Sequence, residues 1–245
     1  MNAPLEAAGL TRRYGDFVAV DAISLRVAPG EIVGFLGANG AGKTTTLRCL
    51  AGLLRPDRGE IRISGHDLAK QSRQAKAALG FVPDRPFLYE RLTTREFLSF
   101  LGTLYRQEPH SAATRAEALI ARLELDRVAD LTIEALSFGS RQKVALIGAL
   151  LHSPALLLLD EPLNGLDPPA ARALKDLLRE HATTGAGVLV STHQLEVADR
   201  LCDRVVLLHH GRVLAEGAPA ELIRARGSGT LEEYILELTR TPPTA

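Results

Sequence analysis

The fold of this chain is decided by eight residues, Gly37-Ala38-Asn39-Gly40-Ala41-Gly42-Lys43-Thr44. An apolar β-type run, Ile32–Leu36, precedes them, and a helical pattern over Thr44–Leu54 follows. The spacing G-x-x-x-x-G-K-[S/T] between a strand and a helix is typical of loops that wrap phosphate groups with backbone N–H groups. We therefore expect a nucleoside triphosphate site at the edge of an α/β sheet.

Within this loop the residue types have separate roles. Glycines let the backbone approach an anion, Lys43 is expected to bridge the outer phosphates, and the Thr44 hydroxyl is expected to reach Mg²⁺. The alternative is a glycine-rich turn with an exposed lysine, which the flanking strand and helix disfavour. The nucleotide-binding residues predicted here are Gly37, Ala38, Asn39, Gly40, Ala41, Gly42, Lys43, Thr44 and Thr45.

A second stretch of sequence indicates what a nucleotide site could do. It is Leu156-Leu157-Leu158-Leu159-Asp160-Glu161. It predicts a buried strand that ends in two carboxylates, at the sheet edge where open α/β folds bind ligands. Asp160 is expected to hold Mg²⁺ through water, and Glu161 to polarise an attacking water molecule as a catalytic residue. Without the phosphate loop, an acidic turn at a strand end would be the better interpretation.

Composition excludes several protein classes. The chain has 245 residues, with 29 basic and 29 acidic side chains, so no net charge favours nucleic acid or anionic lipid. Its apolar runs are too short to cross a bilayer, and its first residues lack a secretory signal pattern. Cys49 and Cys202 lie far apart without metal-ligand spacing, which suits a reducing compartment. We expect a protein of the cytoplasm.

The remaining pattern predicts an α/β fold with two additions. Strands are expected over Leu5–Tyr14 and Phe17–Val27 before the loop, and over Gly59–Ser64 and Leu79–Pro83 after it. From about residue 87 the pattern becomes helical for some 70 residues. After the helical part, strand and helix patterns alternate again. The expected elements are a strand Ala155–Leu159, a helix Pro168–His181, a strand Val188–Ser191, a helix Leu195–Cys202, and a hairpin Val205–Glu216 that turns at His210-Gly211.

The helical insertion begins with a recognisable start signal. Thr93 followed by Glu96 is a capping box, and a second helix is expected at about Ser111–Leu125, with a third after Gly139. An apolar stripe in the first helix is expected to face the core, and it consists of Phe97, Phe100, Leu101, Leu104 and Tyr105.

At this point the sequence resembles the ATP-binding cassette (ABC) ATPases that drive ABC transporters, over about Leu5–Leu238. One further motif carries the resemblance, Leu136-Ser137-Phe138-Gly139-Ser140-Arg141-Gln142, which is similar to the family signature. The resemblance implies that Ser137, Phe138, Gly139 and Ser140 close over ATP held by another subunit. Taken alone, the segment favours a simpler interpretation, an N-cap serine followed by a flexible glycine.

Three single residues gain roles from the same resemblance. Tyr14 lies 29 residues before Lys43, as does the family aromatic that stacks on adenine. The segment Asn164-Gly165-Leu166-Asp167 resembles the family loop that communicates between two ATP sites. Within it, Asp167 also suits the N-cap of a helix that begins with Pro168. His193 corresponds to the catalytic histidine that reaches the γ-phosphate.

The sequence departs from the family pattern at two places. Asp84 stands where most relatives have a glutamine, which makes it a further Mg²⁺ candidate beside Thr44 and Asp160 and weakens the usual amide contact with water. The signature carries Phe138 and Ser140 in place of glycine and glutamine. Pro83–Phe100 and Leu231–Leu238 resemble the subclass of exporters with separate membrane subunits.

The resemblance implies a P-loop NTPase core with a parallel sheet, an N-terminal antiparallel β subdomain and an inserted helical subdomain. The whole chain, 1–245, is then one ABC ATP-binding domain, with its core at about 1–86 and 153–245 and its helical subdomain at about 87–152. The expected cofactors are ATP and Mg²⁺. Expected partners are a second ATPase subunit, identical or related, and a polytopic membrane permease, with this chain peripheral on the inner face of the cell membrane.

The implied function is ATP hydrolysis that drives dimer closure and solute translocation, with export favoured. The alternative from another class is a soluble ABC ATPase that acts on DNA or ribosomes, which lacks support because the chain has no long heptad run or basic surface signal. Two further hypotheses remain. One is a small-molecule kinase, and the other is a clamp that binds ATP without hydrolysing it. No nucleic acid partner is expected.

Overall fold

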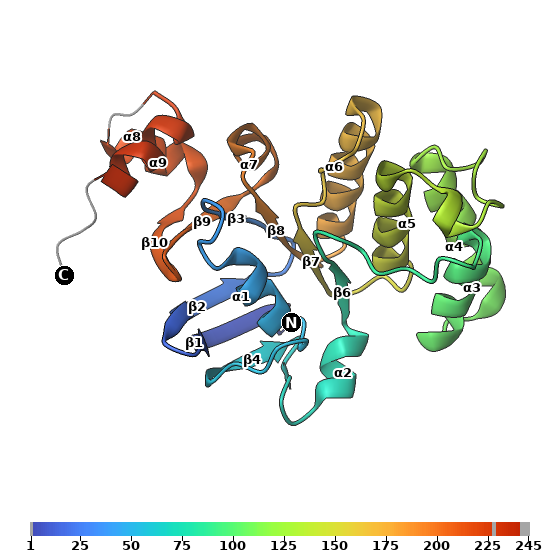
Figure 1. Cartoon of the computed structure of the whole chain (residues 1–245), viewed down its shortest axis with the longest axis horizontal. Helices are drawn as coiled ribbons and strands as arrows, with labels where there is room; N and C mark the ends of the chain where they lie inside the picture. Colours follow the sequence, from blue (N-terminus) through green and yellow to red (C-terminus); the bar gives the residue numbers. More distant parts are fainter. Residues whose placement is uncertain (1, 227–228, 241–245) are drawn as a thin grey trace.

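The computed structural model describes residues 2–226 and 229–240, and two β-sheets lie at its centre (Figure 1). The larger sheet has six strands in the order β10-β9-β3-β8-β7-β6. Its strands are β3 (Ile32–Leu36), β6 (Leu79–Val82), β7 (Leu156–Asp160), β8 (Gly187–Thr192), β9 (Arg204–His209) and β10 (Arg212–Gly217). Strands β6, β7, β8, β3 and β9 pair in parallel, and β10 pairs antiparallel to β9.

The smaller sheet is antiparallel and has the order β2-β1-β4-β5. Its strands are β1 (Leu5–Tyr14), β2 (Phe17–Val27), β4 (Arg58–Ile63) and β5 (His66–Asp67). Buried and more exposed residues alternate along β1 and β2, as expected for a sheet with one face on the core. This is the predicted N-terminal antiparallel part.

Nine α-helices and one short 3₁₀-helix complete the described part of the chain. They are α1 (Lys43–Leu50), α2 (Ser72–Ala77), α3 (Thr94–Leu104), α4 (Pro109–Arg122), η1 (Ile133–Ala135), α5 (Phe138–Leu150), α6 (Pro168–Thr183), α7 (Leu195–Leu201), α8 (Pro219–Arg226) and α9 (Leu231–Arg240). Helices α3, α4 and α5 lie together beyond β6 (Figure 1). In residues 2–226 and 229–240, no helix combines the length and apolarity that a bilayer crossing requires.

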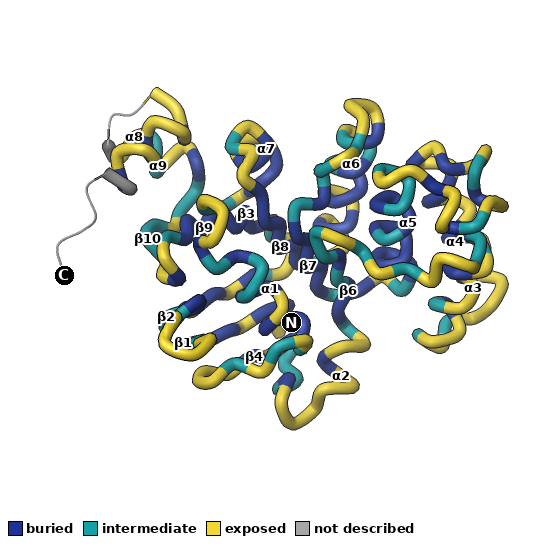
Figure 2. Tube along the Cα trace, in the orientation of Figure 1, coloured by how far each residue is buried: buried dark blue, intermediate teal, exposed yellow. Residues whose placement is uncertain are grey.

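Strand β7 shows how the core is built on both faces of the large sheet. Leu156 and Leu158 pack in one apolar cluster, with α1 and the antiparallel sheet, whereas Leu157 and Leu159 pack in the other, with α5 and α6. All four side chains are fully buried, and Figure 2 shows the central strands as buried throughout. The run of four leucines therefore reflects burial on two faces, as the sequence predicted.

Several predicted boundaries are corrected. The helix expected over Thr44–Leu54 ends at Leu50, and Gly52 follows with a φ of +66°, a conformation that stops a helix. The helix expected at Ser111 begins at Pro109, because the Glu108 side chain caps it by accepting from the N–H groups of His110 and Ser111. The helix expected after Gly139 begins at Phe138. The short elements β5 and α2 were not predicted.

The apolar stripe of α3 is the clearest error. The capping box at Thr93 and Glu96 is present, and Phe97 is buried as expected. However, Phe100 and Leu104 are exposed, because α3 packs on α4 and α5 along one side only and these two side chains lie off that side. The ring of Tyr89 meets the ring of Phe100 edge-on at 5.3 Å between centroids. The spacing of apolar residues predicted the helix correctly, but it predicted that more of the helix surface would be buried than is the case.

We predict that Leu158→Ala will lower the free energy of unfolding by about 2–5 kcal/mol, because it empties a site packed on all sides. Leu104→Ala, on exposed α3 surface, is the matched control and should cost less than about 1 kcal/mol. Urea unfolding followed by circular dichroism measures both. Equal losses in the two variants would contradict this assignment of the core.

Candidate functional site

The phosphate-loop motif lies between β3 and α1, as the sequence predicted. Lys43 is the first residue of α1, and its side chain turns back so that Nζ donates to the carbonyl oxygens of Gly37 at 2.6 Å and Ala38 at 3.2 Å. Lys43 is only 7% exposed. Burial lowers its pKa, while the nearby carboxylates of Glu161 and Asp160 act in the opposite direction. The ammonium group is thus held at the mouth of the loop, facing two acids.

Two glycines of the loop are required by close backbone approach. Gly42 has a φ of +105°, and a Cβ placed on it would lie 2.5 Å from the carbonyl oxygen of Ala19 in β2. At Gly37 a Cβ would lie 2.6 Å from the carbonyl oxygen of Leu208 in β9. The loop is therefore packed between both sheets with no space for a side chain at either position.

The two acids at the end of β7 occupy different environments. Asp160 is 1% exposed, and its Oδ1 accepts a hydrogen bond from the Ser191 hydroxyl of the neighbouring strand β8. Its Oδ2 is buried and has no hydrogen-bond partner among the described residues. Asp160 lines the same cleft as Thr44 and the phosphate loop, and an unpaired carboxylate oxygen there fits a Mg²⁺ site, since hard cations prefer oxygen ligands.

Glu161 turns away from Asp160 because the backbone changes direction between them. Its φ is +50°, and its N–H donates to the Ser191 carbonyl oxygen at 3.1 Å. The carboxylate then lies 2.9 Å from Nδ1 of His193, measured from Oε1. The His193 side chain is 55% exposed and that of Glu161 14%. The arrangement gives one carboxylate at the cleft wall, contacted by an imidazole that solvent can reach.

A single cleft of about 490 Å³ collects most of the predicted site residues. Besides the loop and the two acids, it includes Tyr14, Asp84 and His193, which come from three distant parts of the chain. Its lining is Tyr14, Phe17, Ala19, Ala38, Asn39, Gly40, Ala41, Gly42, Lys43, Thr44, Thr45, Asp84, Asp160, Glu161, Asn164 and His193. Gly37, also predicted, lies at the base of the loop and not on this lining.

Sequence reasoning missed Phe17 and Ser191. Phe17 faces Tyr14 across the β1–β2 turn and lines the same cleft, so two exposed aromatic rings are available to a flat base. The Arg12 guanidinium lies 5.2 Å from the centre of the Tyr14 ring. The spacing Tyr-x-x-Phe around a two-residue turn was a usable signal for Phe17, whereas nothing local pointed to Ser191.

The predicted signature residues lie outside this cleft. Ser137 caps α5 by accepting from the Ser140 N–H at 3.2 Å, and the Phe138 ring is exposed. Asp167 caps α6 by accepting from the Ala170 N–H at 2.8 Å, which confirms the capping role expected for it. The chain therefore presents two separate surfaces, one with the phosphate loop and one with the start of α5.

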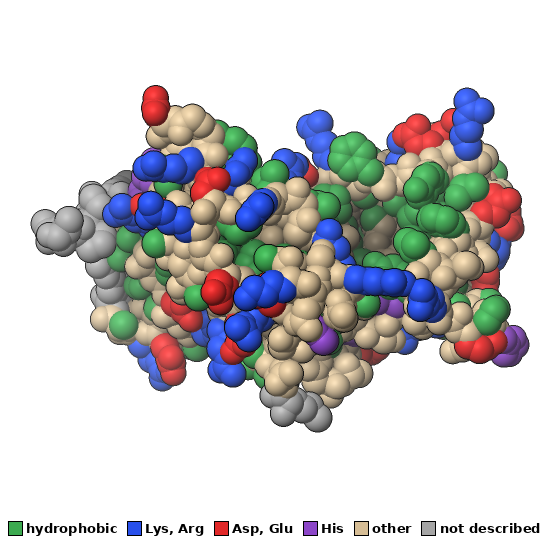
Figure 3. All heavy atoms as spheres, turned by 90° about the horizontal axis from the view of Figure 1, so that it is seen from below, with side chains coloured by type: hydrophobic (Ala, Val, Ile, Leu, Met, Phe, Trp, Pro, Cys, Tyr) green, Lys and Arg blue, Asp and Glu red, His purple; other side chains and the backbone are tan. Residues whose placement is uncertain are grey.

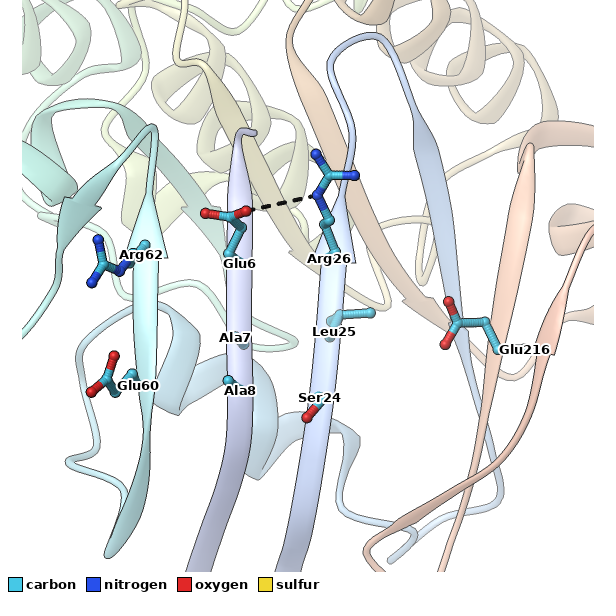
Figure 4. Close-up of a pocket in the computed structure, with 9 residues that line it drawn as sticks. All are labelled: Glu6, Ala7, Ala8, Ser24, Leu25, Arg26, Glu60, Arg62 and Glu216. Carbon is cyan, nitrogen blue, oxygen red and sulfur yellow. Dashed lines mark ion pairs between the residues drawn. The ribbon is translucent and has the colours of Figure 1, made fainter. Parts of the chain in front are cut away.

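A separate hollow of about 420 Å³ lies on the outer face of the antiparallel sheet, where Glu6 and Arg26 approach to 3.8 Å (Figure 4). It has no phosphate-binding backbone and no predicted site residue. Within residues 2–226 and 229–240, no group of three or more His, Cys, Asp or Glu side chains is placed to hold a metal ion by itself. His209 and His210, at the β9–β10 turn, form no such group.

Comparison with known proteins gives consistent matches. A family model described as "ABC transporter" matches residues 20–164. The chain is 38% identical to a Nod factor export ATP-binding protein I of Burkholderia lata, over 95% of this chain and 77% of that protein. It is also 38% identical to a daunorubicin resistance ATP-binding protein of Streptomyces coeruleorubidus, over 94% of this chain and 72% of that protein.

Solved structures agree with the sequence matches. A structure of an ATP-binding subunit of an ABC transporter superposes with a TM-score of 0.91 at 37% identity, covering 96% of this chain and 99% of that one. A dimeric post-hydrolysis ATP-binding cassette with bound ADP and phosphate gives a TM-score of 0.79 at 27% identity, covering 87% of this chain and 98% of that one.

We predict that Gly42→Ala will weaken binding of a fluorescent ATP analogue by about tenfold or more, because the new Cβ must displace the loop from Ala19. Gly185→Ala is the matched control, since Gly185 also has a positive φ, +90°, but has open space around it and lies away from the cleft. The control should lose some stability and keep its affinity. Fluorescence titration decides, and equal affinities in the two variants would contradict the proposed packing of the loop.

Proposed function

The chain belongs to the ABC transporter family as an ATP-binding, ATP-hydrolysing transporter subunit, and from this premise we propose that two subunits close on two ATP molecules. The observation that carries the proposal is the separation of the site into two surfaces. The phosphate loop and the acids share one cleft, while the start of α5 lies outside it. Each ATP is then held between the loop of one subunit and the signature of the other.

In the cleft, each residue type has a defined task. Backbone N–H groups of Ala38–Thr45 surround the phosphates, and Lys43 exchanges its carbonyl contacts for the outer phosphate oxygens. Tyr14, with Phe17 beside it, stacks on the base. The unpaired Oδ2 of Asp160 and the Thr44 hydroxyl hold Mg²⁺, with Asp84 in reach of the same space. When bound, Mg²⁺ supplies charge neutralisation at the phosphates.

Hydrolysis is assigned to Glu161 with His193. The Glu161 carboxylate polarises the attacking water and accepts its proton, which is the role of a general base. The His193 imidazole, 2.9 Å from Glu161 Oε1, holds that carboxylate in one orientation and reaches toward the γ-phosphate. The exposed position of His193 suits a group that completes its contacts only when a second subunit covers the cleft.

The trans site is assigned to Ser137, Phe138, Gly139 and Ser140. The Ser137 hydroxyl caps the Ser140 N–H, and the N–H groups of Phe138 and Gly139 have no carbonyl partner within the helix, so this end attracts the γ-phosphate of the opposite subunit. Loss of that phosphate removes contacts made only in the closed state, and the dimer reopens by a population shift. Asp167 lies on the loop between both surfaces. The two subunits are identical or closely related chains.

We assign the core to about 1–86 and 153–245 and the helical subdomain to about 87–152. The division is supported by the grouping of α3, α4 and α5 at one end of the molecule (Figure 1). The chain enters this group after Asp84, which lines the nucleotide cleft, so a movement of the helices is transmitted to the cleft through that segment.

A polytopic membrane subunit is the proposed partner, docked on the helical subdomain and the segment after Asp84. This segment carries Phe87, which is 95% exposed, and Tyr89, and α3 adds Phe100 and Leu104. Apolar side chains exposed together are typical of a protein interface. Figure 3 shows hydrophobic side chains exposed on the right-hand part of the molecule, where Figure 1 places α3 to α5. The chain would thus act from the inner face of the membrane.

Export is the proposed direction of transport, because relatives named for Nod factor export and daunorubicin resistance match almost the whole chain. The family model is described as ABC transporter and the relatives as export or resistance ATP-binding proteins, and none of them is named for DNA or ribosome binding. The alternative of a soluble ATPase acting on nucleic acid or ribosomes therefore gains no support.

We predict that Glu161→Gln will lower ATP turnover by about a hundredfold or more, because an amide cannot accept the proton from water. Binding of ATP should persist, so this variant should form an ATP-dependent dimer that size-exclusion chromatography detects. Release of inorganic phosphate without an added acceptor measures turnover and excludes a small-molecule kinase.

The matched control is Glu196→Gln, since Glu196 is an exposed glutamate in the first turn of α7 outside the cleft. Its turnover should equal that of the wild type. Ser137→Ala in the Glu161→Gln background should weaken the ATP-dependent dimer. A monomeric wild type that hydrolyses ATP at a rate independent of protein concentration would refute the two-subunit site.

We predict that the tagged chain will co-purify with a polytopic protein from detergent-solubilised membranes. The double substitution Phe87→Ser/Phe100→Ser should reduce that recovery by about tenfold, because it removes exposed apolar contact area. Its unstimulated ATPase rate should remain at the wild-type level. Recovery of ribosomes or DNA instead of a membrane protein would overturn the transporter assignment.

A further inference from the structure

The loop that follows Glu161 is attached to α5 at several points. The side-chain amide of Gln142 donates to the Pro162 carbonyl oxygen at 3.5 Å, close to the start of the loop. At the end of the loop, Oδ2 of Asp167 lies 3.6 Å from Nζ of Lys143. Gln142 and Lys143 are neighbours on the helix that Ser137 caps. One helix thus contacts both ends of the loop.

The middle of the loop is packed just as closely. A Cβ on Gly165 would lie 2.5 Å from Cδ1 of Phe138, and a Cβ on Gly139 would lie 2.4 Å from the Gly165 carbonyl oxygen. The Phe138 ring therefore covers Gly165, which gives this departure from the family signature a structural role. A loop held by both ends and its middle has little freedom to move apart from α5.

Lys143 is the charged member of these contacts. Its side chain is only 9% exposed, and Asp167 is the carboxylate with which it forms an ion pair in the described part of the chain. Burying an ammonium group is costly unless it is paired, so Lys143 strongly favours the loop position that brings Asp167 to it. Asp167 can satisfy both demands because its Oδ1 caps α6 while Oδ2 faces Lys143.

We propose that Lys143 is a positioning residue that makes Ser137 and Glu161 of one subunit move together. The inference rests on the two-subunit function proposed above. In that arrangement Ser137 serves the ATP of the partner, and Glu161 serves the ATP in its own cleft. The ion pair with Asp167 fixes the loop between them, so closure over one ATP orders the catalytic carboxylate beside the other.

The test compares Lys143→Met, which keeps the apolar stem and removes the charge, with Lys143→Arg, which keeps the charge. Lys143→Met should reduce the maximal ATPase rate about tenfold and bring the Hill coefficient for ATP from above about 1.5 to about 1. Affinity of the diluted monomer for a fluorescent ATP analogue should change less than about twofold. Lys143→Arg should restore the rate and the cooperativity.

Lys70→Met is the matched control. Lys70 pairs with Asp67 at the same 3.6 Å, but its side chain is 82% exposed and lies outside the nucleotide cleft and α5. This variant should equal the wild type in rate and in cooperativity. Asp167→Asn, whose amide oxygen retains the cap of α6, should reproduce the Lys143→Met phenotype. The double variant should be no worse than either single one, as expected for two partners of one interaction.

Three results would overturn the inference. They are wild-type cooperativity in Lys143→Met, failure of Lys143→Arg to rescue it, and a lower rate that follows a lower melting temperature at an unchanged Hill coefficient. If Lys143→Met fails to fold, Asp167→Asn alone carries the same test, since Asp167 is largely exposed. A wild type without an ATP-dependent dimer would instead refute the proposed function itself.

Discussion

The pairing of β7 and β3 on either side of β8 is the constraint on which the site depends. Asp160 is aligned with Ser191, and Leu36, the last residue before the phosphate loop, is aligned with Thr192. These strands are buried on both faces, so a shift by one residue would exchange the two apolar clusters and is strongly opposed. The same alignment allows the Ser191 hydroxyl to reach Asp160. The fixed register of these strands thus places the phosphate loop and the two acids, Asp160 and Glu161, at the same edge of the large sheet.

Much of this fold was predictable, because the deciding features are local. The loop between β3 and α1, the leucine run of β7 and the capping box at Thr93 each occupy a few consecutive residues, and the structure has a strand-to-helix loop, a buried strand and a helix start at these places. Features that depend on neighbouring elements were not predictable in the same way. The exposure of Phe100 depends on which side of α3 meets α4 and α5, and the α3 sequence carries no information about its partners.

The same distinction applies to the site. Lys43, Asp160 and Glu161 follow from motif spacing and meet in the cleft as expected. Ser191 and Lys143 were missed because their significance lies in the side chain opposite, 31 residues away for Ser191 and Asp160. A serine at the end of a strand and a lysine in a helix are unremarkable residues until the pairing of strands and the packing of α5 are known. The contacts of both residues depend on tertiary structure.

The presence of Asp84 makes the nucleotide cleft more negative. The lining of the cleft holds three carboxylates, Asp84, Asp160 and Glu161, and one ammonium group, that of Lys43. A cleft with this excess of negative charge repels a free triphosphate, and the backbone dipoles at the start of α1 offset only part of that repulsion. A divalent cation reverses the balance, since it is attracted by the same carboxylates and neutralises the phosphates. For the Mg²⁺ site proposed above, the cleft would therefore suit the complex of nucleotide and metal better than the nucleotide alone. Asp84, in place of the neutral glutamine that the family resemblance leads us to expect, would make that preference stronger.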